Sequence, residues 1–326
     1  MRSGLLQTAV GGTPLIKIQS LSQSTGCEIW GKAEFLNPGG SVKDRAAYGI
    51  LTEAVQQGQL QPGDTVYDGT AGNTGIGLAT LAAQMGFKTK LVLPESLAQE
   101  KYQTLEALGA EVVKVKLVPF ADPHHFYHTA KKLAEADPKG FWANQFENLA
   151  NFRIHLTTTG PEIWDQTQGR ITDFCAASGT GGTFSGVSRF LKDKNPLVRT
   201  TLVDPAGSGL YDYIQNGEIK SEGNSVTEGI GIMRITANFK EARVDDALRV
   251  SDQEMIDMLY HLAKHEGLLV GPSAALNICG AWKIAQGGKG RVVTTILCDG
   301  ALRYQSKIFN PAWLKEKNLI PQALKL

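Results

Sequence analysis

Apolar residues in this chain form short runs that alternate with longer segments in which apolar positions recur at helical spacing. Short runs rich in β-branched residues predict strands, and the longer periodic segments predict helices. The predicted strands cover residues 65–67, 88–93, 111–115, 173–177, 200–203, 268–270 and 292–298. The predicted helices cover residues 74–85, 98–108, 253–265 and 274–285. In the helix over 253–265, one apolar face predicts packing against the core; it carries Met255, Met258, Leu259 and Leu262.

Mostly apolar strands that are separated by helices indicate parallel sheets covered on both faces, and therefore an α/β fold. A chain of 326 residues is long enough for two domains of ordinary size. In sheets of this class, functional residues lie at the carboxyl ends of the strands. The turns after the predicted strands are therefore where we expect the site.

The composition narrows the function classes. A net charge of +1 favours neither nucleic acid nor an anionic membrane surface as a partner. No apolar run reaches the roughly 18 residues of a membrane span, and the N-terminus lacks a signal-peptide pattern, so we expect a cytoplasmic protein. The spacing of the cysteines fits neither a zinc site nor a disulfide framework and predicts reduced thiols. They are Cys27, Cys175, Cys279 and Cys298.

Three strand-to-helix turns combine glycine with small hydroxyl or amide residues. They cover residues 68–75, 178–183 and 271–274. Such turns expose backbone N–H groups at the positive end of a helix, which suits an anion. For residues 179–183 two interpretations stay open: a site for a tetrahedral anion, or a tight turn with Thr183 as the helix N-cap. The run is neither a Walker loop nor a dinucleotide fingerprint.

Lys43 follows an Asn-Pro-Gly-Gly turn at residues 37–40 and lies in the first turn of a predicted helix. The helix dipole disfavours a cation there, and with partial burial it would lower the pKa of the amine and make it a better nucleophile and base. The alternative is a solvated surface lysine, beside which Asp44 is the charge that the dipole favours.

Residues 37–45 closely resemble the cofactor-lysine motif of fold-type II pyridoxal-phosphate enzymes. Residues 70–75 resemble the substrate-carboxylate loop of the cysteine synthase branch, residues 179–183 the family's phosphate cup, and residues 271–273 the segment that meets the pyridine nitrogen. All four motifs agree in order and spacing, and the similarity runs from about Gly11 to Phe309. The chain is thus similar to the cysteine synthase (O-acetylserine sulfhydrylase) and cystathionine β-synthase family.

This resemblance implies a fold like that of the tryptophan synthase β-subunit, with two doubly wound domains and mainly parallel sheets. Residues 47–150 would form a smaller, mobile domain that carries the substrate loop. Residues 1–46 together with 151–326 would form the larger domain that binds the cofactor phosphate.

The resemblance also implies roles for individual residues. Lys43 would hold pyridoxal 5'-phosphate as a Schiff base and act as the catalytic base. The other cofactor-binding residues would be Asn73, Gly179, Thr180, Gly181, Gly182, Thr183 and Ser273. The substrate-binding residues would be Thr70, Ala71, Gly72, Asn73, Thr74, Gln145 and Gly231. Ser273 could equally be a plain helix N-cap.

The reaction implied is β-replacement, in which O-acetyl-L-serine and sulfide give L-cysteine and acetate through an aminoacrylate on the cofactor. The neutral Ser273 hydroxyl beside the ring would suit prompt elimination. Three departures from the family pattern leave the substrates open. Ala71 stands where serine is common, residues 298–304 are less regular than expected, and residues 203–208 are reminiscent of the cystathionine β-synthase branch.

The alternatives are cystathionine β-synthase, cyanoalanine synthase, or a non-catalytic scaffold that binds serine acetyltransferase. The chain has no extra length for a haem segment or a regulatory module, which disfavours a regulated cystathionine β-synthase, and Lys43 disfavours the scaffold. A homodimer is expected from the resemblance. No metal site is expected, because the histidines that lie close together in the sequence lack a ligand pattern. They are His124, His125 and His128, and the i,i+4 pair His261 and His265.

Overall fold

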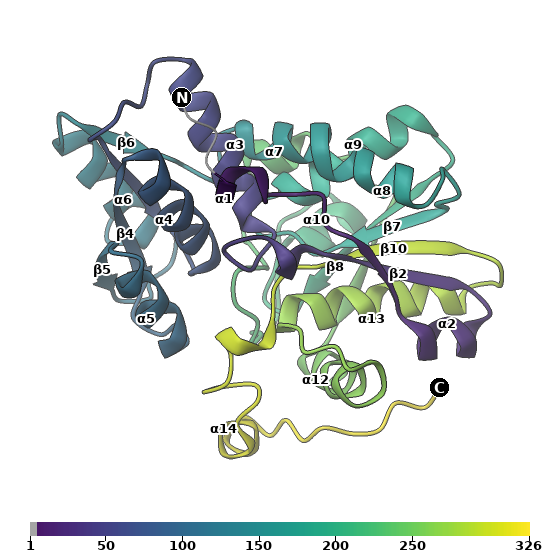
Figure 1. Ribbon diagram of the computed structural model, residues 1–326. Coiled ribbons are helices and arrows are strands. Elements are labelled where there is room, and N and C mark those ends of the chain that lie inside the picture. Colours follow the sequence, from purple (N-terminus) through teal and green to yellow (C-terminus); the bar gives the residue numbers. More distant parts are fainter. Residues whose placement is uncertain (1–4) are drawn as a thin grey trace.

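The computed structural model describes residues 5–326, whose strands form two sheets (Figure 1). The larger sheet has the order β1-β2-β10-β7-β8-β9, and the smaller has the order β5-β4-β3-β6. All described pairings are parallel except that of β1 with β2. The α/β fold with mainly parallel sheets is therefore confirmed.

The larger sheet lies between two layers of helices. Its strands are β1 (Leu15–Lys17), β2 (Glu28–Ala33), β7 (Asp173–Ala176), β8 (Arg199–Pro205), β9 (Asp246–Val250) and β10 (Val292–Leu297). One face packs on α2, α12 and α13, and the other on α8 and α9 (Figure 1). Every residue of β10 is buried, because this central strand has neighbours on both edges and helices on both faces.

The smaller sheet has strands β3 (Thr65–Gly69), β4 (Lys88–Pro94), β5 (Glu111–Val115) and β6 (Gly140–Trp142). Its core is separate from the two cores of the larger sheet and includes Ile50, Leu78 and Leu91. Helix α3 packs on α4 from this part and on α7 from the other, so it spans the junction (Figure 1).

The helices have the following bounds. Up to the end of β7 they are α1 (Leu5–Thr8), α2 (Gln19–Thr25), η1 (Glu34–Leu36), α3 (Lys43–Gln56), α4 (Asn73–Met85), α5 (Gln99–Ala107), α6 (Phe126–Ala136), α7 (Ala150–Ile154), η2 (His155–Thr159) and α8 (Gly160–Gln166). Beyond β7 they are α9 (Gly182–Lys194), α10 (Leu210–Asn216), α11 (Ala237–Lys240), α12 (Asp252–His261), η3 (Leu262–Glu266), α13 (Pro272–Gln286), η4 (Ala301–Arg303) and α14 (Pro311–Glu316).

Most of the predicted elements are present within one to two residues of their expected ends. The predicted strand over 268–270 is wrong: these residues follow the left-handed Gly267, and Val270 makes only an isolated bridge with Gly300. The predicted helix over 253–265 ends as a π-helix, η3. Its apolar face is buried as expected. The sequence pattern missed β1, β2, β6 and β9.

The carboxyl ends of β3 and β7 lead into the turns at residues 68–75 and 178–183, and that of β10 leads into residues 298–304, whereas the turn at residues 271–274 follows no strand. As the topology rule requires, the segments that follow these ends converge on one cavity. The domain boundaries at residues 46–47 and 150–151, and the mobility of the smaller part, stay predictions.

Candidate active site

A cavity of about 310 Å³ lies where the two sheets meet. Its walls include Lys43 from the start of α3 and Ser273 from the start of α13. The loop before α4 and the first turn of that helix contribute Thr70, Ala71, Asn73 and Thr74. A smaller recess of about 20 Å³ adjoins it and is lined by residues 178–181 and Thr183. Most of the predicted site residues line these two spaces. Gly72 and Gly182 do not line either space.

Lys43 is the first residue of α3 and lines both spaces. Its Nζ has no hydrogen-bond or ion-pair partner among residues 5–326. Loss of water around the amine lowers its pKa, although the nearby Cys298 and Asp299 partly oppose this. An unpartnered amine with a lowered pKa is suited to act as a nucleophile or a base.

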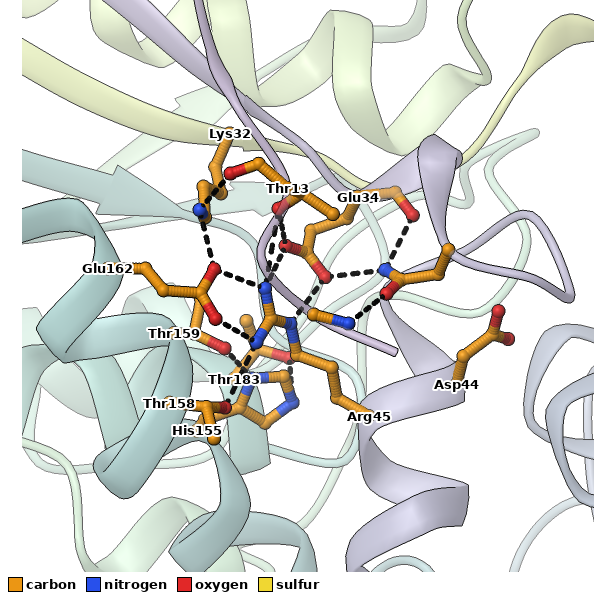
Figure 2. A network of polar contacts seen from close by, with 12 residues as sticks. Thr13, Lys32, Glu34, Asp44, Arg45, His155, Thr158, Thr159, Glu162 and Thr183 are labelled. Carbon is orange, nitrogen blue, oxygen red and sulfur yellow. Dashed lines mark hydrogen bonds and ion pairs between the residues drawn. The ribbon is translucent and has the colours of Figure 1, made fainter. Parts of the chain in front are cut away.

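A buried charge network around Arg45, two residues after Lys43 in the chain, anchors the start of α3 (Figure 2). The Arg45 guanidinium donates to Glu34 at 2.8 and 2.9 Å and to Glu162 at 2.8 and 2.7 Å, and Lys32 pairs with Glu162 at 2.6 Å. Although burial opposes it, the bonds from Arg45 and Lys32 lower the pKa of Glu162 to about 2. Two cations thus balance two anions, and the start of α3 is held rigidly.

The turn between β7 and α9 requires glycine at three positions. A Cβ on Gly179 would lie 2.2 Å from the Gly229 carbonyl oxygen, and one on Gly182 would lie 2.1 Å from Asn151 Oδ1. Gly181 has a positive φ of 94°, and its Cβ would meet the Phe239 backbone at 2.6 Å. The chain is therefore bent more tightly than larger residues allow.

This turn presents unused donors. No backbone N–H from Gly179 to Thr183 has a hydrogen-bond partner within the described chain. These groups lie at the N-terminus of α9, whose last turn carries Lys192 and Lys194 and whose first turn carries no acidic residue. A free row of N–H groups at a positive helix end fits a phosphate.

The turn between β3 and α4 is stabilised by Thr70. Its Oγ1 accepts from the N–H groups of Gly72 and Gly75 at 3.1 and 3.3 Å. Gly72 has a φ of 114°, and a Cβ there would meet Lys101 at 2.5 Å. Ala71 and Asn73 line the cavity at the N-terminus of α4. This loop forms a second helix end that can receive an anion.

The Gln145 side chain lines the cavity, and its amide atoms already have partners. Gln145 Nε2 donates to Asp68 Oδ2 at 2.6 Å and to the Gly69 carbonyl at 3.1 Å, while Oε1 accepts from Thr74 at 2.5 Å. Burial raises the pKa of Asp68 to about 7. In this arrangement Gln145 orients the Thr74 hydroxyl.

Asn73 is held by two residues that sequence reasoning did not single out. Its Nδ2 donates to Asp299 at 2.7 Å, and its Oδ1 accepts from Arg303 at 2.7 Å. Both partners belong to the segment 298–304, whose departure from the family pattern gave no indication of this role. Ser273 lies beside the Cys298 thiol, and Gly231 donates its N–H to the Ser178 carbonyl at 3.1 Å.

Lys101 and an aromatic wall were also missed. Lys101 is buried, pairs with Glu228 at 2.5 Å and donates to the Ala71 carbonyl at 3.3 Å. Farther along the cavity, Arg234 stacks on Phe120, Tyr127 and Phe146. These residues come from separate segments, so no local pattern could have grouped them.

The pyridoxal-phosphate dependent enzyme family matches residues 6–299 of this chain. The chain belongs to this family. It is 48% identical to cysteine synthase 1 of Neurospora crassa over 97% of its own length and 85% of that protein. It is 44% identical to the cysteine synthase of Dictyostelium discoideum, over 97% of its own length and 86% of that protein. The structure of an O-acetylserine dependent cystathionine beta-synthase from Helicobacter pylori matches with a TM-score of 0.84 and 37% identity, covering 94% of this chain and 98% of that one.

The cavity of this pyridoxal-phosphate enzyme fits its cofactor on structural grounds. The free N–H groups of residues 179–183 suit the phosphate, and the recess beside them reaches Lys43. The predictions of family, fold type, cofactor and a β-replacement enzyme are confirmed. The roles of individual site residues stay predictions.

Two kinds of feature are absent from residues 5–326. No helix there is long and apolar enough to cross a membrane. No group of three or more histidine, cysteine or acidic side chains in that part of the chain is arranged to hold a metal ion.

Proposed function

We propose that this enzyme is a cysteine synthase, which replaces the acetate of O-acetyl-L-serine with sulfide to give L-cysteine. One observation carries the proposal. The unpartnered Lys43 amine lines the cavity and its adjoining recess together with two helix N-termini, those of α4 and α9, each preceded by a turn in which glycine is required. One end suits a phosphate and the other suits the carboxylate of an amino acid.

We assign the cofactor contacts as follows. Lys43 would hold pyridoxal phosphate covalently, residues 179–183 would bind its phosphate, and Ser273 would face its ring nitrogen. Asn73 would donate to the ring hydroxyl with the amide proton that Asp299 leaves free. When bound, the cofactor supplies an electron sink for the bonds at Cα and Cβ of the substrate.

The substrate contacts follow from the loop before α4. The amino-acid carboxylate would accept from the free N–H groups at Asn73 and Thr74, while Thr70 keeps the loop in shape and Gln145 orients Thr74. Ala71 offers no hydroxyl, so binding at that position depends on its backbone. Gly231 and its neighbours would close the entrance.

Lys43 would also move the proton. Its lowered pKa favours the neutral amine, which can take the proton from the substrate Cα and later return it. The Arg45 network limits movement of the start of α3, so the amine is kept in a fixed position.

The test is spectroscopic. The purified protein loaded with pyridoxal phosphate is expected to absorb visible light and to change its spectrum on addition of O-acetyl-L-serine. Addition of sulfide is then expected to restore the original spectrum while cysteine accumulates. A response to homocysteine in place of sulfide would favour cystathionine β-synthase, the activity for which the Helicobacter pylori protein is named. A response to cyanide would favour cyanoalanine synthase. A protein that binds no cofactor would overturn the enzyme proposal and leave the scaffold.

The assembly and location form a further part of the proposal. We infer a cytoplasmic homodimer whose smaller part, residues 47–150, closes on the substrate, and a cavity entrance that can take the C-terminus of serine acetyltransferase. These inferences rest on the family resemblance. Sedimentation velocity with and without each ligand tests the dimer, the closure and the partner.

A further inference from the structure

A buried histidine next to the phosphate cup has no role in the proposed reaction. His155 begins η2, a π-helix, and has no exposed surface. Helix η2 packs closely on α9, since a Cβ on Gly186 would lie 2.6 Å from the His155 Cβ. Single turns of π-helix occur often at functional sites.

Both ring nitrogens of His155 meet a threonine hydroxyl (Figure 2). Nδ1 lies 2.8 Å from Thr159 Oγ1, and Nε2 lies 3.1 Å from Thr183 Oγ1. Thr183 is the last residue of the phosphate cup and lines the recess. The three side chains therefore form a chain of hydrogen bonds that ends at the cup.

The His155 imidazole in this series of hydrogen bonds is neutral. Burial, together with the charges of Arg45 and Lys43, lowers the pKa of His155 well below its usual value. A neutral imidazole donates from one nitrogen and accepts at the other, so the chain of hydrogen bonds can run in only one of two directions.

The surroundings of the two threonines decide the direction. Thr159 is fully buried, and within residues 5–326 its hydroxyl has no partner except His155. If Nδ1 carried the proton, the Thr159 hydroxyl proton would be buried without an acceptor, which is costly. Thr159 therefore donates to Nδ1, and Nε2 donates to Thr183. The Thr183 proton is then free to point into the recess.

We propose that His155 is a positioning residue that aims the Thr183 hydroxyl at the oxyanion in the phosphate cup. The anion is a phosphate monoester, and the assignment rests on the cofactor site proposed above. Without the ring, the Thr183 hydroxyl loses its fixed direction. With the opposite tautomer, Thr183 donates its proton to Nε2 of His155, and that proton no longer points at the anion.

The first test reads the tautomer directly. Protein labelled with ¹⁵N-histidine has six histidines, and the signal of His155 is identified by its loss in His155→Gln. We expect a neutral ring with its proton on Nε2, with or without pyridoxal phosphate. A proton on Nδ1 in the loaded protein would overturn the proposal, whatever the stability of any variant.

The second test asks whether the two residues act through one bond. His155→Phe and Thr183→Val are each expected to weaken pyridoxal-phosphate binding about tenfold, as loss of a hydrogen bond to a charged group does. The double variant is expected to lose about tenfold as well, since both changes remove the same contact. A loss of about a hundredfold, the product of the two, would indicate separate structural effects and contradict the relay.

Pyridoxal without its phosphate is the matched ligand, and Thr157→Val is the matched variant. Thr157 lies on the same π-helix but is exposed and donates to the Arg153 carbonyl. We expect pyridoxal affinity to be unchanged by His155→Phe and Thr183→Val, and Thr157→Val to bind both ligands normally. An equal loss for both ligands would mean that His155 merely supports the fold. These readouts need no amino-acid substrate, so they remain decisive if the proposed reaction is wrong.

Discussion

At the scale of single residues, the chemistry of this protein depends on groups that lack partners. Lys43 has an amine without a hydrogen-bond partner among the described residues, and residues 179–183 have N–H groups without acceptors. Such groups are costly in a folded protein unless a ligand uses them. Pyridoxal phosphate matches both groups, because its aldehyde can react with the amine and its phosphate can accept from the N–H groups.

Replacing Lys43 by alanine should remove both cofactor attachment and proton transfer. We expect turnover to fall by about 10²- to 10⁴-fold, with loss of the covalent adduct. Borohydride reduction followed by mass spectrometry of the peptide measures the adduct. Lys88→Ala, which removes an exposed lysine, should keep both properties. An adduct on a different lysine would contradict the assignment.

A buried carboxyl predicts a pH effect on stability. One oxygen of Asp204 accepts from the Tyr211 N–H and the other has no partner, and burial raises its pKa from 3.8 to about 6. The folded state therefore loses stability as the pH rises from about 4 through 6, by on the order of 3 kcal/mol in all.

Asp204→Asn keeps the acceptor and removes the charge, so it should be more stable than the wild type at pH 8, with a smaller difference at pH 4.5. Urea unfolding at the two pH values measures this, and Asp193→Asn at an exposed site is the control. If the difference in stability between Asp204→Asn and the wild type were the same at both pH values, ionisation of Asp204 would not be its cause.

At the scale of elements, the site is built from helix N-termini. Helices α3, α4, α9 and α13 all begin at the two spaces, and each follows a turn that contains glycine. The turns before α4 and α9 leave backbone donors free, so the positive ends of two helices act on anions at a short distance.

Gly182→Ala should abolish cofactor binding, because the added Cβ would lie 2.1 Å from Asn151 Oδ1 and displace the start of α9. Gly300→Ala is the matched control near the site, since its Cβ would have 3.8 Å to the nearest atom and its φ is −96°. Fluorescence titration with pyridoxal phosphate compares the two. Equal affinity in both variants would refute the requirement for glycine in the cup.

At the scale of the whole molecule, polar bridges around the cavity join the part with the smaller sheet to the part with the larger one, in addition to the packing of α3. Lys101 of α5 reaches Glu228, which also pairs with Lys307 near the C-terminus. Lys101 also donates a hydrogen bond to the Ala71 carbonyl of the substrate loop. The bridge thus connects the smaller sheet, the site entrance and the C-terminal segment.

Lys101→Met should raise KM for O-acetyl-L-serine about tenfold and change kcat less, because the loop that binds the carboxylate loses its support in ground state and transition state alike. Steady-state kinetics measure both constants. Lys131→Met removes one member of an exposed pair with Glu135 and should have little effect. An unchanged KM would show that the loop does not depend on the bridge.

The cofactor should also stabilise the assembled fold. At the proposed site it would contact residues from the parts of both sheets, and a ligand at 100 times its Kd adds about 2.7 kcal/mol to the free energy of unfolding. For a chain of this length we expect an increase of about 5 °C in Tm. Calorimetry of the protein before and after removal of pyridoxal phosphate with hydroxylamine measures it, and re-addition should restore the original Tm.

The sequence by itself determined the fold class, the family and the position of the main chemistry. Periodicity and glycine-rich turns are local properties, so the strands β3, β4, β5, β7, β8 and β10 and the turns at Lys43, Thr70 and Gly179 could be located along the chain. The short strands β1 and β6 escaped because three residues carry almost no periodic signal.

Only the tertiary structure decided which distant residues complete the site. His155 reaches Thr183 across 28 positions, Asn73 reaches Arg303 across 230, and Lys101 reaches Glu228 across 127. No sequence spacing encodes such pairs, because they arise when parallel strands bring their carboxyl ends to one edge. The motifs are local, so they can be identified in the sequence, whereas tertiary packing determines which residues orient them.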